Sequence, residues 1–490
     1  MKIRVKRLKR PLSLALIVFG SLAGFCLLLR DGVTSPGAQA LNYVVPLVIV
    51  GTCSIIAASL LQAHRFNILS PIPWFYLASA LFFGIGPLVF VFGNDETINM
   101  LHVLARYEID EFGLLHANTL VLSGLFLVTL TILITKKFIP WNDNASTITF
   151  QNFDVARAEI ALIVFVVIGA VIKYIFVLPY LLRLVSWTLP GVVQQLSMML
   201  PAAIIIAMLL ANRGFTKYRI WLYLLITSET ISSLLTFAKT SFLYVMISIL
   251  IGRFLCQKSI RSLVVSMVAL ALFSGLILNP FVLYARKNVD VKGTLEPTVL
   301  IDTINEFLRS GVHSEGEQSD QQGWWMRLSY ANFQKWSIDS YANGLKGDSL
   351  EAAYTALLPR TLFPDKREYL DGAVFSDLLE ANLSARTRTD MSFFAEGYWN
   401  GGPWGLMVVC AWTGIVLSGF TRFAFSQLGS GRLSMLLPML IGITVGIGPQ
   451  FWWVPTYVGG VGIAGVYALL LWFFLERTAQ RQRTSSSIGK

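Results

Sequence analysis

A basic strip punctuated by prolines, LLPRTLFPDKREYLDG at residues 357–372, holds the side chains best suited to bind phosphate. Its cations are Arg360, Lys366 and Arg367. Arginine offers a planar fork of N–H donors that matches phosphate oxygens, and lysine offers a compact positive charge. The strip therefore suits a diphosphate group, although each cation could instead pair with a nearby carboxylate such as that of Asp365.

A carboxylate that could act as a general base follows in the stretch DMSFFAEGYWNGGPWG, residues 390–405. Glu396 precedes a glycine cluster, and Gly401 and Gly402 allow a close backbone approach or a sharp re-entry of the chain. Partial burial would raise the pKa of the Glu396 carboxyl toward the range that suits proton transfer. The alternative is that Glu396 only begins a helix.

Two ionisable residues, Lys173 and Glu229, lie inside long apolar runs. An ionisable group in hydrocarbon costs at least a few kcal/mol unless it faces a polar interior or a partner. Helical rise places Glu229 near the middle of its run and Lys173 closer to one end. The two side chains could therefore pair, either to fix helix packing or as part of a substrate path.

The elements that position these residues are membrane-spanning helices. The chain has 490 residues, of which 55% are apolar and 14% charged, and its mean hydropathy is +0.62. Runs of about twenty apolar residues predict an all-α polytopic membrane protein with about twelve spans in a single domain over residues 1–490. The predicted spans are 11–30, 41–62, 70–92, 114–135, 158–180, 191–211, 219–237, 240–256, 262–284, 402–421, 434–451 and 458–475.

The distribution of lysine and arginine predicts the orientation of these spans. The start MKIRVKRLKR is basic, and every second loop along the chain carries Lys or Arg. Because cytoplasmic loops are enriched in these residues, we expect both termini to lie in the cytoplasm. An A-x-A pattern at Ala38 and Ala40 resembles a signal-peptidase site. The preceding apolar stretch is too long for an ordinary signal peptide, so we interpret it as the first span.

This orientation places residues 285–401 outside the cytoplasm, as one long loop between the ninth and tenth spans. Three cations then lie near the outer face: Lys173, Lys239 in the turn between spans seven and eight, and Arg286 after span nine. This runs against the usual enrichment of Lys and Arg on the cytoplasmic side. Apolar spacing predicts short amphipathic helices in the loop: one through Leu300 and Ile304, one ending before Pro359, and one over residues 323–344. The aromatic residues of the last stretch could stack on sugars, but we favour anchoring in the headgroups.

Other classes of function lack support in the sequence. The net charge of +11 comes from clusters beside apolar runs, which indicates membrane orientation rather than nucleic-acid binding. The four cysteines lie in apolar runs without a CxxC pair, and the histidines are scattered, so we expect no disulfide framework, metal site or cofactor. No nucleotide-binding loop, dinucleotide fingerprint or hydrolase motif is present. The energy for a reaction would have to come with the substrate.

The chain resembles the bacterial oligosaccharide repeat-unit polymerases, the Wzy-type O-antigen polymerases. The resemblance rests on the spans, the late outer loop, the segment FAKTSFLYVMISILIG, the strip LLPRTLFPDKREY and the re-entry AEGYWNGGPWG. It implies a GT-C-like glycosyltransferase in the bacterial inner membrane, with undecaprenyl-diphosphate-linked oligosaccharides as substrates at the periplasmic face. It also implies a chain-length regulator as a possible partner, besides the membrane lipids.

The resemblance also implies roles for individual residues. Arg360, Lys366 and Lys239 would bind the diphosphate, and Glu396 would be the first candidate for deprotonating the acceptor hydroxyl. Arg360 would be catalytic because it neutralises the leaving group, with Arg367, Arg286, Lys173 and Glu229 in the substrate path. A related O-antigen ligase would use a loop histidine, and His313 in its acidic context weakens that alternative.

Two further alternatives remain open. A flippase or exporter of lipid-linked sugars would also need cations and a polar interior, but such transporters usually show internal repeats, and none is visible here. A non-catalytic scaffold in envelope assembly would tolerate alanine at Arg360, Lys239 and Glu396 together.

Overall fold

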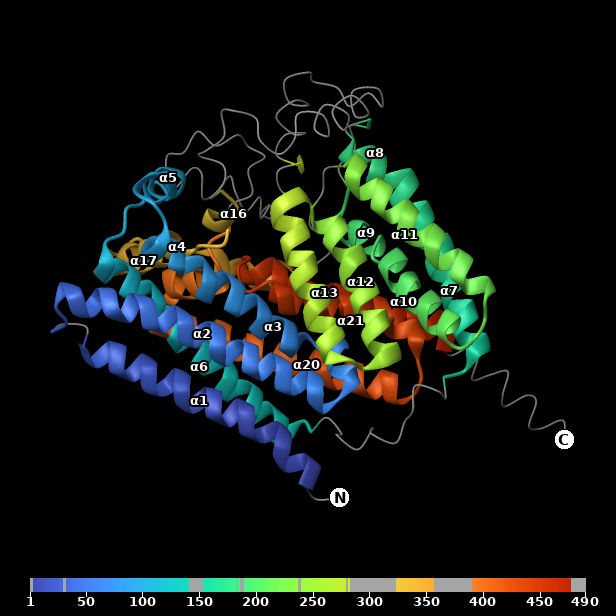
Figure 1. Ribbon diagram of the computed structural model, residues 1–490, viewed down its shortest axis with the longest axis horizontal. Helices are drawn as coiled ribbons and strands as arrows, with labels where there is room; N and C mark the ends of the chain where they lie inside the picture. The colour runs from blue at the N-terminus through green and yellow to red at the C-terminus, as the bar shows by residue number, and fades with distance from the viewer. Residues whose placement is uncertain are drawn as a thin grey trace. The chain divides into compact units, whose positions relative to one another are not determined.

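The described part of this membrane protein consists of helices. The computed structural model describes residues 3–29, 32–140, 153–182, 184–185, 189–236, 239–278, 281–282, 323–356 and 390–476, and no strand occurs within these ranges (Figure 1). Ten helical stretches there are long and apolar enough to cross a membrane. The chain is therefore an all-α, multi-pass membrane protein.

The ten stretches agree with ten of the predicted spans. They are α1 (Ile3–Leu29, apolar from Pro11), α2 (Ser35–Ala63), Pro71–Phe92, α6 (Glu111–Phe138), Val155–Leu181, Gly191–Asn212, α12 (Lys239–Gln257), Ile260–Leu278, α20 (Phe393–Gly429) and Val454–Glu476.

Five of these stretches are divided into shorter elements. These are α3 (Pro71–Ser79), η2 (Ala80–Ile85), η3 (Gly86–Leu88) and α4 (Val89–Phe92); α7 (Val155–Ala170), η6 (Val171–Val177) and α8 (Leu178–Leu181); α9 (Gly191–Leu196) and α10 (Met199–Asn212); α13 (Ile260–Phe273) and η7 (Ser274–Leu278); and η11 (Val454–Gly459), α22 (Gly460–Leu471) and η12 (Trp472–Glu476).

The remaining elements are shorter or more polar. They are η1 (Arg65–Leu69), α5 (Asp95–Ala105), α11 (Lys217–Leu235), α16 (Gly323–Met326), α17 (Ala331–Ala342), η9 (Ser349–Ala352), α18 (Ala353–Ala356), η10 (Leu433–Met435) and α21 (Leu436–Ile447).

Two of the twelve predicted spans are not among the ten described helices that are long and apolar enough to cross a membrane. The predicted span 219–237 coincides with α11, which is a helix but carries Lys217, Arg219 and Glu229. The predicted span 434–451 coincides with the shorter apolar helix Leu433–Ile447. Both segments are helical as expected. The charged residues of α11 and the short length of Leu433–Ile447 separate them from the ten stretches.

The chain folds into two compact units, each assembled from separate stretches of sequence. Unit 1 comprises Met1–Ala145, Ser319–Ser426 and Ile441–Gly465. Unit 2 comprises Ser146–Gln318, Gln427–Leu440 and Val466–Lys490. The prediction of a single membrane domain with an outer loop at 285–401 stays a prediction.

In unit 1, α1, α2 and α6 run side by side and α3 packs on α2 (Figure 1). Buried hydroxyl pairs join helices that are distant in sequence: Ser70 and Thr421 lie 2.7 Å apart between their Oγ atoms, and Tyr76 OH lies 2.8 Å from Thr129 Oγ1. Small residues and interhelical hydrogen bonds are typical of helix contacts in membranes.

Part of the predicted outer loop belongs to unit 1 and contacts its helices. The aromatic stretch 323–344 contains α16 and α17, as expected, and η9 and α18 follow. Trp325 Nε1 donates to the Ile85 carbonyl at 2.9 Å, and Asn332 Nδ2 donates to the Tyr107 carbonyl at 2.6 Å. The third predicted loop helix, through Leu300 and Ile304, lies outside the described residues.

In unit 2, α10 forms the centre. It contacts α7, α11 and α12, and nearly all of its residues are buried. At the other extreme, only 6% of the apolar window in Ile260–Leu278 is buried. This span therefore presents most of its surface to its surroundings.

The long helix α20 is two helical segments, 393–400 and 403–429, joined at a sharp kink. Gly402 has φ +59° and ψ −142°, a conformation that only glycine adopts without strain. A Cβ atom at Gly405 would overlap the Gly397 carbonyl oxygen, so the segments on either side of the kink touch. The close backbone approach that was one of the two predictions for Gly401 and Gly402 is thus present in the described fold.

We expect Gly402→Ala to lower the free energy of unfolding by about 1–3 kcal/mol, since it combines a strained φ with a Cβ 2.5 Å from the Tyr341 ring. Thermal unfolding of the purified full chain in detergent measures the effect. Gly419→Ala in the same helix is the matched control, because a Cβ there meets nothing within 4 Å. Equal melting temperatures for the two variants would contradict the role of the kink.

Candidate functional site

The two buried residues Lys173 and Glu229 form an ion pair within unit 2. Lys173 Nζ lies 2.7 Å from Glu229 Oε2, and the two side chains are 11% and 2% exposed. Tyr174 OH donates to the second carboxylate oxygen at 3.4 Å. The predicted pairing is direct, and it joins η6 to the middle of α11.

Hydroxyl side chains continue along α11 from this pair toward α12. Ser232 and Ser233 donate to the Glu229 carbonyl at 3.0 and 2.7 Å, and Thr236 donates to the Ser232 carbonyl at 3.0 Å. By helical rise, Thr236 lies about 10 Å along the axis from Glu229. Lys239, half-buried, is the first residue of α12. A line of polar groups thus runs from the ion pair to the end of α11.

Glu396 lies in unit 1, in the first turn of α20, and is fully buried. Ser349 Oγ donates to its Oε1 at 2.8 Å, and the backbone N–H of Trp453 donates to its Oε2. Hydrogen bonds satisfy both carboxylate oxygens, as a buried charged group requires. The side chain joins α20 to η9 and to the start of the last span.

Asn400, one turn after Glu396, strengthens this junction. Its Nδ2 donates to Ser349 Oγ at 2.9 Å and to the Glu396 carbonyl at 2.8 Å. Its Oδ1 accepts from the Leu350 N–H at 3.1 Å. The first two turns of α20 therefore hold residues 349–350 by both side chain and backbone.

Aromatic residues form the other side of the junction. Trp399 Nε1 donates to the Leu345 carbonyl at 2.9 Å, and Trp399 packs in a buried cluster with Met391 and Trp452. Phe333 and Trp336 of α17 pack against this cluster. These two aromatic residues of the 323–344 stretch thus contact protein in the described fold.

Asp390, which opens the motif stretch, lies close to Tyr330. Burial raises the pKa of the Tyr330 hydroxyl, and the charge of Asp390 raises it further. A tyrosine phenol is already protonated at neutral pH, and this shift extends the protonated state of Tyr330 to more alkaline pH, so it serves as a hydrogen-bond donor or a neutral acceptor.

Four of the predicted site residues lie outside the described residues: Arg286, Arg360, Lys366 and Arg367. Of the others, the structure brings Lys173 and Glu229 into contact and places Lys239 after α11 in the same unit. Glu396 belongs to the other unit.

The sequence prediction missed the partners of Glu396. Asn400 follows it at the i, i+4 spacing that places two side chains on one helix face, so that residue could have been found. Ser349 lies 47 positions earlier in the sequence, and Trp453 contributes only a backbone N–H. No local pattern marks either of them.

No metal-binding cluster of three or more His, Cys, Asp or Glu side chains occurs in the part of the chain that the structure describes. Comparison of the chain with protein-family models, with curated proteins and with solved structures returned no match. Any function therefore has to be argued from the residues themselves and from the resemblance stated above.

Removing one partner of the buried pair should be far more damaging than removing both. We expect Lys173→Met to cost about 3–5 kcal/mol, because it leaves the Glu229 charge buried without its cation. The double variant Lys173→Met/Glu229→Met should recover most of that loss. Thermal unfolding of these two variants and of Glu229→Met in detergent tests this, and a loss in the double variant equal to the sum of the two single losses would show that the pair is not coupled.

Asn400→Ala should release residues 345–356 from α20. It removes three hydrogen bonds, each worth about 1 kcal/mol. Limited proteolysis of the folded protein should then cut this segment faster than in wild type. Asn343→Ala, at an exposed position just before this segment, is the matched control and should leave the cleavage rate unchanged.

Proposed function

We propose that this chain is a glycosyltransferase of the bacterial inner membrane that polymerises undecaprenyl-diphosphate-linked oligosaccharide repeat units at the periplasmic face. In this proposal the fold is GT-C-like, α11 and Leu433–Ile447 complete a set of twelve spans, and both termini are cytoplasmic. The product is O-antigen, capsule or exopolysaccharide.

The observation that carries the proposal is the kinked start of α20. The stretch AEGYWNGGPWG, on which the resemblance partly rests, contains the kink at Gly402 and the buried carboxylate of Glu396. Through Ser349, this junction holds the described part of the predicted outer loop against membrane-spanning helices of the same unit. A soluble loop and a bundle joined in this way can form one surface for a substrate with a lipid tail and a polar glycan.

The chemistry requires few protein groups because a glycosyl diphosphate is already activated. The acceptor hydroxyl attacks the anomeric carbon, the bond from that carbon to the phosphate oxygen breaks, and undecaprenyl diphosphate leaves with the electron pair. Fixed cations stabilise the charge that develops on the leaving group. We assign this role to Arg360, with Lys239, Lys366, Arg367 and Arg286 as further phosphate contacts.

Glu396 is the proposed base that accepts the proton of the acceptor hydroxyl. A base must come within about 3 Å of the proton it removes, directly or through one water molecule. Because Glu396 is fully buried, this role requires the Ser349 contact to open when the acceptor binds. The Lys173–Glu229 pair and the hydroxyls of α11 would form the polar wall of the substrate path.

Deletion of the gene in the source bacterium should abolish the long glycan ladder and leave single repeat units on the lipid carrier or the lipid core. Sizing of lipid-linked oligosaccharides and surface glycans measures this. Long polymer stranded on the carrier would instead identify a ligase. Repeat units trapped on the cytoplasmic leaflet would identify a flippase, and an unchanged ladder without a redundant enzyme would refute the proposal.

In the complemented deletion strain, Arg360→Ala should lower polymer yield at least tenfold, because a charge-assisted contact to the leaving group is worth about 1.5–3 kcal/mol. Arg360→Lys should retain part of the activity. Arg327→Ala, at an exposed position in the same predicted loop, is the matched control and should behave as wild type. Normal polymer from Arg360→Ala at normal protein levels would remove Arg360 from the site.

A further inference from the structure

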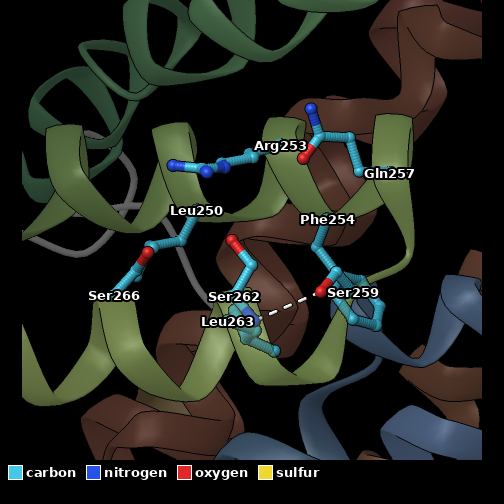
Figure 2. Close-up of a pocket in the computed structure, with 8 residues that line it drawn as sticks. All are labelled: Leu250, Arg253, Phe254, Gln257, Ser259, Ser262, Leu263 and Ser266. Atoms are coloured by element: carbon cyan, nitrogen blue, oxygen red, sulfur yellow. Dashed lines mark hydrogen bonds between the residues drawn. The ribbon is translucent and has the colours of Figure 1, made fainter.

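A hollow with mainly apolar walls and several polar side chains lies between α12 and α13, next to the short turn that joins them (Figure 2). It is shallow and open on one side, and the figure of about 210 Å³ for the space between the lining residues includes this open part. The polar lining comes from Arg253, Gln257, Ser259, Ser262 and Ser266, and the apolar lining from Leu250, Phe254 and Leu263. All of these residues belong to unit 2, and none has a role in the proposed glycosyl transfer.

Arg253 is the charged group of this hollow. No ion pair or hydrogen bond of its guanidinium with another residue occurs within the described ranges. Figure 2 shows its side chain extending away from Gln257, toward the side of the hollow where Ser266 lies. Arginines near the end of a membrane helix usually extend toward the polar interface, because a cation in hydrocarbon is costly. An Arg253 side chain directed away from the turn is therefore suited to an anion in the hollow.

Two serines of α13 complete the polar wall. Ser262 and Ser266 are one helical turn apart, and Figure 2 shows both hydroxyls pointing from α13 toward α12. Ser259 caps α13 by accepting the Ser262 N–H at 3.2 Å, which fixes the start of the helix. Two hydroxyl donors and one guanidinium fork thus face a common space, an arrangement that matches the oxygens of a phosphodiester.

The surface beside the hollow is apolar and uncovered. Val264, Val265 and Val268 of α13 are 50%, 62% and 53% exposed, and the whole span is the least buried of the ten. Lys258 and Arg261 lie at the turn itself, where cations attract anionic headgroups by about 1 kcal/mol each. A ligand that fits both features carries a phosphate and long acyl chains.

We propose that the hollow between α12 and α13 binds an anionic glycerophospholipid of the surrounding leaflet. Arg253 holds the phosphodiester, with Ser262 and Ser266 as hydrogen-bond donors. The acyl chains lie along the exposed valines of α13. The site serves as a lipid-binding site that is separate from the glycan chemistry and does not depend on it.

The test measures lipid binding to the purified full-length chain in detergent by native mass spectrometry. The probes are phosphatidylglycerol and phosphatidylcholine with the same acyl chains. Wild type should retain phosphatidylglycerol in preference to phosphatidylcholine. Arg253→Gln should weaken phosphatidylglycerol binding about tenfold, as expected for the loss of one charge-assisted contact. Arg253→Lys, which keeps the charge without the fork, should fall between the two.

Arg261→Gln is the matched control. It removes the same charge at an exposed position in the first turn of α13, outside the lining of the hollow. It should lower phosphatidylglycerol binding by no more than the loss of one surface cation, about 1 kcal/mol, and so by less than Arg253→Gln does. The double variant Ser262→Ala/Ser266→Ala should lose part of it. Soluble glycerophosphoglycerol should compete poorly, because it lacks the acyl chains.

Three outcomes would overturn the proposal. Equal losses in Arg253→Gln and Arg261→Gln would show only general attraction to a basic turn. Full competition by glycerophosphoglycerol or by inorganic phosphate would show an anion site that ignores the lipid. Equal retention of the two phospholipids by wild type would show that the hollow does not select a negative charge.

Discussion

The reversal of the chain at Gly401–Gly402 is the constraint on which unit 1 depends most. Because glycine alone adopts the backbone of Gly402, the 393–400 segment can fold back until Gly397 touches Gly405. This contact brings the buried Glu396 carboxylate within reach of Ser349 and the Trp453 N–H. Segments that are widely separated in sequence thereby meet at one carboxylate. A single side chain larger than hydrogen at the kink would disturb all of these contacts together.

Three buried carboxylates in the described part of the chain, those of Glu229, Glu396 and Glu476, are each held by donors or cations, and each joins elements that are distant in the sequence. Glu229 meets Lys173 between η6 and α11. Glu476, at the end of η12, accepts from Ser434 at 2.6 Å and lies 3.5 and 3.6 Å from nitrogens of Arg157 and Arg432. An uncompensated charge in such surroundings would cost several kcal/mol, whereas a compensated one favours a single arrangement of the helices. The same groups that could carry chemistry therefore also determine the packing.

This double role bears on the proposed glycosyl transfer. Glu396 is held by donors from two other segments, so a base at this position would be coupled to the position of residues 349–350. Acceptor binding and loop movement would then be one event, and water would be excluded until the acceptor arrives. The lipid site at Arg253 is of a different kind, because it uses an exposed cation and an uncovered helix rather than a closed network. The proposed polymerase would thus use buried charges for the reaction and an open one for its place in the bilayer.

The sequence by itself determined the class of fold and ten of the helical spans. It also indicated a close backbone approach or sharp re-entry at Gly401 and Gly402, and it marked Lys173 and Glu229 as candidates for pairing. Each of these follows from a local rule: apolar length, glycine content, or the cost of a charge in hydrocarbon. Helical spacing could also have indicated Asn400 beside Glu396. Only the tertiary structure decided that Ser349 and the Trp453 backbone bind Glu396. The same holds for the packing of Phe333 and Trp336 on protein. It also decided that Arg253 of α12 and Ser266 of α13 line one hollow. These contacts join positions whose distance in space depends on how whole helices pack, and no periodicity in the sequence records that packing.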